Sequence, residues 1–238
     1  MAAFQALYPK VDSVVTWCKD HALKISPSKT QLTYLSRQRA WTAAAFPNAR
    51  IDGHHPDHKR TLDLLGIRLD ASLTLGAHAR KVSERAAART TRLRTVMSAN
   101  RRIPRWTGKV LYQTMIRPIF LFGAPLLLMS PQRSRRPVEV GERRALRAIL
   151  RCPIGVPTED LYRTAQVQPI TTAYEVASTK FLKWCVGNRN RRILQSTKEG
   201  PGRREDSVYW SPPLQRCLAL LPRREQECIR RRIEELID

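Results

Sequence analysis

Acidic residues are scarce in one long stretch of this 238-residue chain. Residues 71–152 contain 18 Lys and Arg but only 3 Asp and Glu, whereas residues 1–70 and 153–238 each carry a net charge of +4. A run of sequence with that excess repels itself unless an anion compensates it, and polyphosphate backbone is the commonest such anion. The imbalance therefore predicts a nucleic-acid partner for the middle third. A membrane surface fits less well, since no juxtamembrane anchor accompanies the charge.

The chain also lacks the marks of secretion and of a membrane span. Its 5 cysteines are widely spaced and include no Cys-x-x-Cys pair, which indicates a reducing compartment and argues against a zinc site. No charged segment followed by an apolar core opens the chain, and the longest apolar run, 119–129, is interrupted by Gly123 and Pro125. We therefore expect an intracellular protein, nuclear or cytoplasmic, that is not secreted and has no membrane partner.

Three histidines, His54, His55 and His58, form the one cluster that suggests a metal. No Cys, Asp or Glu stands near them at convincing ligand spacing, so an exposed polar loop over residues 36–58 is the favoured interpretation. We predict no metal site.

Periodicity predicts an α+β chain that begins with mixed structure. Apolar residues recur at helical spacing over 4–22, and 23–35 reads as strand, turn and strand around Ser26-Pro27-Ser28. Residues 61–78 follow as a strand that turns a corner before a helical pattern begins, and Gly66 within it suggests a bulge or a close approach by another backbone, of which the bulge is favoured.

The remainder of the chain reads as helical. Helices are expected over 75–100, 104–117 (interrupted by Pro118), 133–151, 158–165 (capped by Thr158-Glu159-Asp160), 170–194 and 222–237. The segment 119–129 is apolar nearly all round and should be buried, and 196–213 reads as a linker. Amphipathic patterns assign Trp17, Trp106 and Trp184 to the core, whereas Trp41 and Trp210 lie in polar loops.

The helix over 75–100 carries the pattern most specific for binding. Four cations spaced i, i+4, i+8 and i+11 fall within one stripe, with an apolar stripe beside it formed by Val82, Ala86, Leu93 and Met97. The cations span about 17 Å at 1.5 Å per residue, enough to meet several phosphates. Glu84 is the only acid between Arg80 and Arg105, which argues against an ordinary solvated face. We call Lys81, Arg85, Arg89 and Arg92 the ladder, and expect Arg101, Arg102 and Arg105 to extend it.

The order of several motifs resembles the C-terminal part of non-LTR retrotransposon reverse transcriptases of the jockey type. The motifs are LKISPSKTQLTYL, LDLLGIRLDASLTLGAH, IRPIFLFGAP and PTEDLYRTAQVQPI, and the resemblance runs from about Val11 to Asn190. It implies that Lys29, in the Ser-x-Lys-Thr turn, lies near the phosphates of the incoming nucleotide, although an ordinary turn lysine is the competing interpretation. It also implies that Leu65, Gly66 and Ile67 resemble the hairpin that grips the primer end, and that the following helices resemble the thumb.

The resemblance suggests four parts. Residues 1–70 would be the C-terminal remnant of a polymerase palm, 71–152 a basic thumb-like domain, 153–195 a helical extension, and 196–238 a linker with a terminal helix. The family holds its catalytic Mg²⁺ ions with an early palm aspartate and an Asp-Asp hairpin, and no Asp-Asp pair occurs in this chain. We therefore expect a truncated polymerase that binds an RNA/DNA hybrid or RNA, with no catalytic residues and no cofactor of its own.

Two other hypotheses stay open. The chain could be a non-catalytic RNA-binding component of a ribonucleoprotein that shares only the basic helices, which would prefer a particular folded RNA. It could also become active when a separate segment supplies the fingers and the palm aspartates.

Overall fold

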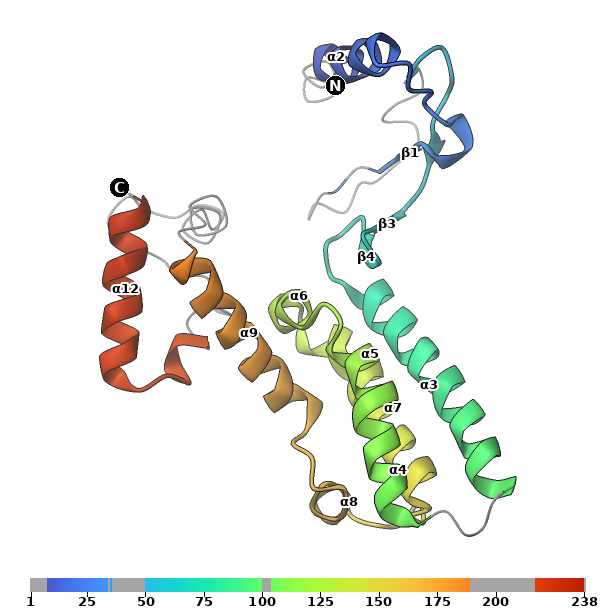
Figure 1. The fold of residues 1–238 in the computed structure, drawn as a ribbon, viewed down its shortest axis with the longest axis vertical. Helices are drawn as coiled ribbons and strands as arrows, with labels where there is room; N and C mark the ends of the chain where they lie inside the picture. The colour runs from blue at the N-terminus through green and yellow to red at the C-terminus, as the bar shows by residue number, and fades with distance from the viewer. Residues whose placement is uncertain (1–7, 34, 36–49, 100–103, 189–216, 238) are drawn as a thin grey trace. The chain divides into compact units, whose positions relative to one another are not determined.

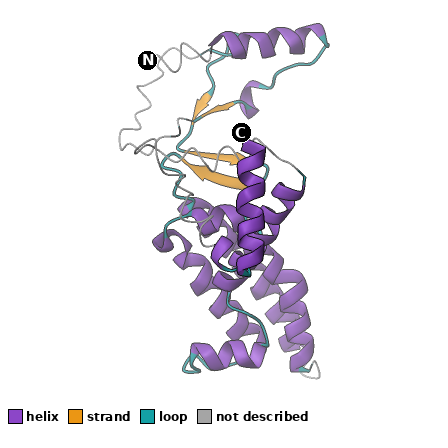
Figure 2. Ribbon diagram, turned by 90° about the vertical axis from the view of Figure 1, so that its left-hand side faces the viewer, coloured by secondary structure: helices purple, strands orange, loops and turns teal. Residues whose placement is uncertain are grey.

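The computed structural model describes residues 8–33, 35, 50–99, 104–188 and 217–237 (Figure 1). The chain folds as two compact units, Met1–His78 (unit 1) and Ala79–Asp238 (unit 2). Helices dominate, and Figure 2 shows the strands as short pieces, which is compatible with the expected α+β class. None of the helices in the described ranges is both long and apolar enough to cross a membrane.

The expected amphipathic helix near the start of the chain is present in unit 1 as α2, over Tyr8–Asp20. Pro9 lies in its first turn, where the missing N–H costs little. The start of the helix predicted over 4–22, most of the loop predicted over 36–58, and Trp41 lie outside the residues that the structure describes.

The prediction of strand, turn and strand over 23–35 is only partly right. The turn is a short 3₁₀ helix, η1 (Pro27–Lys29), closed by the Thr30 hydroxyl, which donates to the Ser26 carbonyl at 2.8 Å. Residues 23–26 form no strand, because no other strand pairs with them among the described residues and the Leu23 N–H bonds locally to the Cys18 carbonyl instead. The strand after the turn is β1 (Gln31–Leu32), and it pairs in parallel with β2 (Asp57–His58), inside the segment predicted to be a loop.

Residues 61–70 form a tight antiparallel hairpin rather than a bulged strand. The strands β3 (Thr61–Leu64) and β4 (Ile67–Asp70) pair Leu64 with Ile67, so only Leu65 and Gly66 connect them. Both have positive φ, 48° and 86°, which is the backbone of a two-residue type I′ turn. The predicted bulge at Gly66 is wrong, because the glycine supplies a turn conformation and not an extra strand residue.

The long basic helix is present as α3 (Gly76–Ala99), close to its predicted bounds. Just before this helix, the Asp70 carboxylate accepts hydrogen bonds from the Thr74 N–H at 2.9 Å and from the Thr74 hydroxyl at 3.0 Å. These bonds hold residues 70–74 in a local turn that ends two residues before the helix begins.

The helix predicted to stop near Pro118 instead continues through a π turn. It runs as α4 (Arg105–Leu111), the π-helical η3 (Tyr112–Ile116) and α5 (Arg117–Leu121). Pro118 stands in the first turn of α5, after the π turn has shifted the hydrogen-bond register. The extra residue of the π turn accommodates the missing N–H, so the proline does not end the helix.

The apolar segment 119–129 is split at Gly123, whose φ is 75°, and α6 (Ala124–Met129) follows. Phe120, Leu127 and Leu128 are buried, but Phe122 and Met129 are exposed, so the expectation of burial all round is wrong. The segment forms two short helices that each keep one side on the core.

Four further helices complete the described part of unit 2: α7 (Gln132–Leu150), α8 (Thr158–Ala165), α9 (Ile170–Gly187) and α12 (Arg223–Ile237). Thr158 is the first residue of α8 and not its cap, since Pro157 occupies the cap position and no side chain caps the helix. The predicted linker 196–213, the end of the 170–194 helix and Trp210 lie outside the described residues.

The predicted burial of three tryptophans is wrong. Trp17, Trp106 and Trp184 are exposed by 53%, 67% and 53%. Each belongs to a helix with a buried side but lies outside that side; Trp17, for example, is two residues from the buried Val15 and so points the opposite way. Spacing along a helix defines the stripe, and the helices packed against it decide how wide the buried part is.

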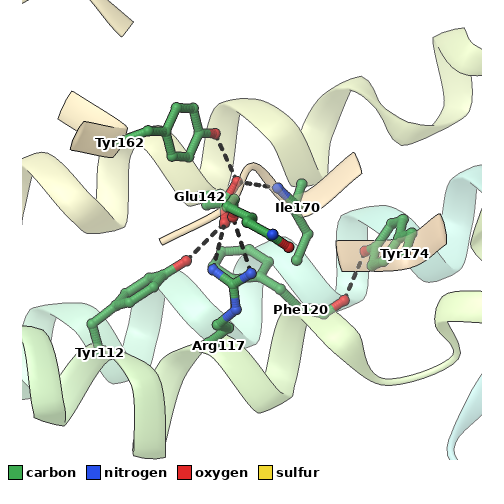
Figure 3. A network of polar contacts seen from close by, with 8 residues as sticks. Tyr112, Arg117, Phe120, Glu142, Tyr162, Ile170 and Tyr174 are labelled. Atoms are coloured by element: carbon green, nitrogen blue, oxygen red, sulfur yellow. Dashed lines mark hydrogen bonds and ion pairs between the residues drawn. The ribbon is translucent and has the colours of Figure 1, made fainter. Parts of the chain in front are cut away.

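A buried carboxylate joins the elements of unit 2 (Figure 3). Glu142 of α7 is fully buried and accepts hydrogen bonds from the Tyr112 hydroxyl at 2.8 Å, the Tyr162 hydroxyl at 2.7 Å and the Ile170 N–H at 2.9 Å. Arg117 Nη1 lies 3.8 Å from the same carboxylate. Four segments, η3, α5, α8 and the start of α9, therefore meet at one side chain. Burial and the Glu142 charge raise the pKa of Tyr112 and of Tyr162 above the usual tyrosine value, so both stay protonated donors.

Candidate nucleic-acid interface

The ladder lies along α3 as predicted, beside the apolar stripe. Val82, Ala86, Leu93 and Met97 are buried, which confirms that this stripe packs on the core. Arg85, Arg89 and Arg92 are exposed, whereas Lys81 is half-buried. Three guanidinium groups thus project from one ridge of the helix, without a salt bridge to any residue in the described ranges. The binding of phosphates by this ridge stays a prediction.

The proposed extension of the ladder is not described. Arg101 and Arg102 lie outside the described residues, and Arg105 opens α4 with a side chain that is also outside them.

Helix α7 carries a second row of cations that sequence reasoning underestimated. Arg133, Arg136, Arg144, Arg147 and Arg151 recur with Val140 at spacings of three and four, which places them along one face that continues into the residue after the helix. The opposite face holds the buried residues Val138, Glu142, Ala145 and Ile149. We call these five arginines the α7 row. The spacing was available in the sequence, but Val140 interrupts the series of arginines and concealed it.

The α7 row faces a seam between α7 and α3. The Ser83 hydroxyl donates to the Pro137 carbonyl at 3.0 Å, and Arg151 Nη2 donates to the Met97 carbonyl at 2.7 Å. Each bond joins a residue of α3 to the residue 54 positions later in the sequence, the first near the start of both helices and the second near their ends. The two helices therefore run parallel, with a constant offset, over about four turns. Gly141 permits the close approach, since a Cβ there would overlap Ser83 Oγ and lie 3.3 Å from Phe120 Cε1.

Two hollows lie along this seam. One of about 350 Å³ is lined by Ser83 together with Arg133, Arg136 and Arg144. The other, of about 490 Å³, is lined by Arg94, Met97 and Ser98 of α3 and by Arg147, Arg151 and Ile154. Each is open, and each presents at least three guanidinium groups. On α3, Ser83, Arg94 and Ser98 lie on the other side of the buried stripe from the ladder, so unit 2 has two separate cationic surfaces.

The residues predicted from the family resemblance in unit 1 occupy turns. Lys29 is exposed at the end of η1, in a turn that the Thr30 and Ser26 backbone closes with a 3.1 Å hydrogen bond. Leu65 and Gly66 form the tip of the β3–β4 hairpin, where Leu65 is 91% exposed, and Ile67 opens β4. The hairpin exists, and its role in gripping a primer stays a prediction.

The carboxylates of unit 1 do not form a metal site. Asp52 pairs with Lys19 at 2.7 Å, Asp63 with Arg68 at 2.8 Å, and Asp70 holds Thr74. No group of three His, Cys, Asp or Glu side chains that could hold a metal occurs in the parts of the chain that the structure describes, His54, His55 and His58 included. The lack of metal-binding aspartates for polymerase chemistry stays a prediction.

Comparison with known proteins identifies the class that these features resemble. The chain contains a region like the RNA-directed DNA polymerase of a non-LTR retrotransposon, which confirms the resemblance found in the motifs. The relative is a probable RNA-directed DNA polymerase from transposon BS of Drosophila melanogaster, 25% identical over 168 residues. The match covers 71% of this chain and 18% of that protein, so the chain spans less than a fifth of its relative. No protein-family model matches, and no solved structure matches significantly.

Proposed function

We propose that this chain is a template–primer-binding part of a non-LTR retrotransposon reverse transcriptase. In this proposal, residues 1–70 are palm-derived, 71–152 act as a thumb, and the α3 ladder holds the phosphates of an RNA/DNA hybrid. Phosphate contacts position a duplex without reading its sequence, so little base selectivity is expected. The protein would act inside the cell, in the nucleus or cytoplasm, where its nucleic acid is found.

One observation carries the proposal. Arg85, Arg89 and Arg92 are exposed on one ridge, directly beside residues that fix the same helix to the core. A helix anchored along one stripe presents its neighbouring cations in a constant row, which favours several simultaneous phosphate contacts. The similarity to an RNA-directed DNA polymerase supports a nucleic acid as the ligand.

The test replaces the three exposed ladder arginines together, R85A/R89A/R92A. Its matched control, R223A/R230A/R231A, removes the same charge from exposed positions on α12. Affinities for an RNA/DNA hybrid, duplex DNA and a folded RNA are measured over a salt series. We expect the hybrid to bind best, and the slope of log K against log salt to become shallower by about 2–3 in the ladder variant alone.

Two results would contradict the proposal. An unchanged slope for the hybrid would make the ladder a solvated face. Preference for one folded RNA over the hybrid would favour the ribonucleoprotein alternative.

Polymerase chemistry would need carboxylates from a palm and fingers segment, with their Mg²⁺ ions. We expect no primer extension by the 238 residues alone. Extension that appears when such a segment is added would favour the hypothesis of a complemented enzyme.

A further inference from the structure

We propose that the seam between α3 and α7 is a second binding site, which holds one single strand of nucleic acid by its phosphates. The inference rests on the proposed nucleic-acid binding, but assigns a different ligand form to a different surface. The site consists of the α7 row together with Arg94 of α3.

Charge is the first argument for this site. Arg94, Arg133, Arg136 and Arg144 have no acidic partner among the described residues, and the two acids of α7 lie elsewhere: Glu142 in the core and Glu139 half-buried. Arg147 Nε is buried and finds no hydrogen-bond acceptor within the same described ranges. A buried donor without an acceptor, beside several arginines without acidic partners, favours an anionic ligand that carries hydrogen-bond acceptors at regular intervals, as a row of phosphates does.

Shape distinguishes the seam from the ladder. The ladder occupies a ridge, so its cations can contact the outward-facing phosphates of a duplex without entering a groove. The seam is a trough between two parallel helices whose axes lie on the order of 10 Å apart. One strand can lie along such a trough, whereas the backbone of an intact duplex cannot descend between the helices.

The lining residues predict how the strand is held. Arginines flank the trough, while Pro137, Val140, Met97 and the 92% exposed Ile154 supply apolar surface. No aromatic side chain lines either hollow, so the stacking that gives base preference is missing from the site as described. From Arg133 to Arg151 the row rises about 27 Å at 1.5 Å per residue. At the 3.4 Å per phosphate of a stacked strand that length accommodates about eight nucleotides, and fewer if the strand is extended.

The experiment compares three variants of the full chain on oligo(dT) of 4, 8, 12 and 16 nucleotides and on a blunt RNA/DNA hybrid. The variant of the seam, called the groove variant, is R94Q/R136Q/R144Q. It keeps Arg147 and Arg151, because these two side chains donate hydrogen bonds to the carbonyls of Val156 and Met97 and so stabilise the fold. The ladder variant is R85Q/R89Q/R92Q, matched in charge. The rescue variant is R94K/R136K/R144K. Thermal unfolding confirms that each is folded.

We expect oligo(dT) affinity to rise up to about eight nucleotides and then level off. Each phosphate contact to a single strand contributes about 0.7 to the slope of log K against log salt, so three lost contacts lower log K by about 2 at 0.1 M salt. The groove variant should therefore lose roughly 100-fold in oligo(dT) affinity at that salt concentration. Its hybrid affinity should change by less than threefold. The lysine variant should keep most of the oligo(dT) affinity, because phosphate contacts depend mainly on the charge.

Different failures are distinguishable. Unchanged oligo(dT) binding by the groove variant would overturn this inference, and so would an equal loss on the hybrid, which would make the seam part of the duplex surface. Unchanged hybrid binding by the ladder variant would overturn the proposed function while leaving the seam intact.

Discussion

Residues 1–78 and 79–238 differ in what holds them together. In the described part of unit 1, the buried apolar side chains are Val15, Pro56 and Leu75, and the polar contacts are mostly local turns and exposed ion pairs such as Lys19 with Asp52. Unit 2 packs its helices around large buried residues and around Glu142, which joins segments distant in sequence. Local contacts depend on backbone conformation, whereas long-range contacts depend on complementary partners. The two units should therefore respond to different substitutions.

The largest effect is expected from Glu142→Ala. The change leaves the Tyr112 and Tyr162 hydroxyls and the Ile170 N–H without their acceptor and removes the carboxylate near Arg117, so we expect a loss of about 3–5 kcal/mol of unfolding free energy. Chemical denaturation measures the loss, and hydrogen exchange should place it in unit 2 with unit 1 unchanged.

Glu139→Ala is the control for this prediction. It removes a half-buried acid from the same helix but breaks none of these bonds. An equal loss in the two variants would mean that charge on α7, and not the buried hub, stabilises unit 2.

The next effect is a loss of stability at alkaline pH. Burial first, and then Glu142, raise the pKa of Tyr112 above its ordinary value of 10.0, and burial also raises that of Tyr174. The folded state keeps these protons when the unfolded state would release them. Their contribution is therefore complete below about pH 10 and falls above it, by up to about 1.4 kcal/mol per pH unit for Tyr112. Unfolding midpoints in urea from pH 8 to 11 measure the slope, and Tyr112→Phe should reduce it.

A smaller effect tests the seam. Gly141→Ala would place a methyl group against Ser83 Oγ and strain its hydrogen bond to Pro137, so we expect a loss of about 1–3 kcal/mol. The double variant S83A/G141A removes the overlapping oxygen and should recover most of that loss, because alanine is the better helix residue. No coupling between the two positions in denaturant unfolding would show that α3 and α7 do not approach closely there.

The smallest pair of effects concerns unit 1 and has opposite signs. Gly66→Ala should destabilise the β3–β4 hairpin by about 1 kcal/mol, since an alanine resists φ of 86°. Leu65→Asn should stabilise it by about 0.5–1 kcal/mol, because asparagine tolerates the positive φ that this exposed leucine adopts. Hydrogen exchange over residues 61–70 measures both, and two changes of the same sign would contradict the type I′ turn.

Much of the helical content could be predicted from the sequence because it depends on local periodicity. The bounds of α3 and α7, the burial of Val82 and Leu93, and the exposure of the ladder arginines agree with the expected stripes. The resemblance to a retrotransposon polymerase was also available from the order of short motifs, and the similarity to the transposon BS protein confirms it.

Tertiary structure decided the features that need a partner from another segment. β1 finds its partner at β2 about 26 residues away, Pro118 is accommodated by a π turn, and Trp106 stays exposed because no described helix covers it. The seam likewise forms because α3 and α7 run parallel, with each residue of α3 near the residue 54 positions later. The helical periodicity of either segment alone does not predict that the two helices lie side by side. The sequence by itself therefore determined which face of each helix is apolar or cationic, through the 3.6-residue period. Only the packing decided which of those faces meet, because contacts between distant segments depend on shape and partner and not on local pattern.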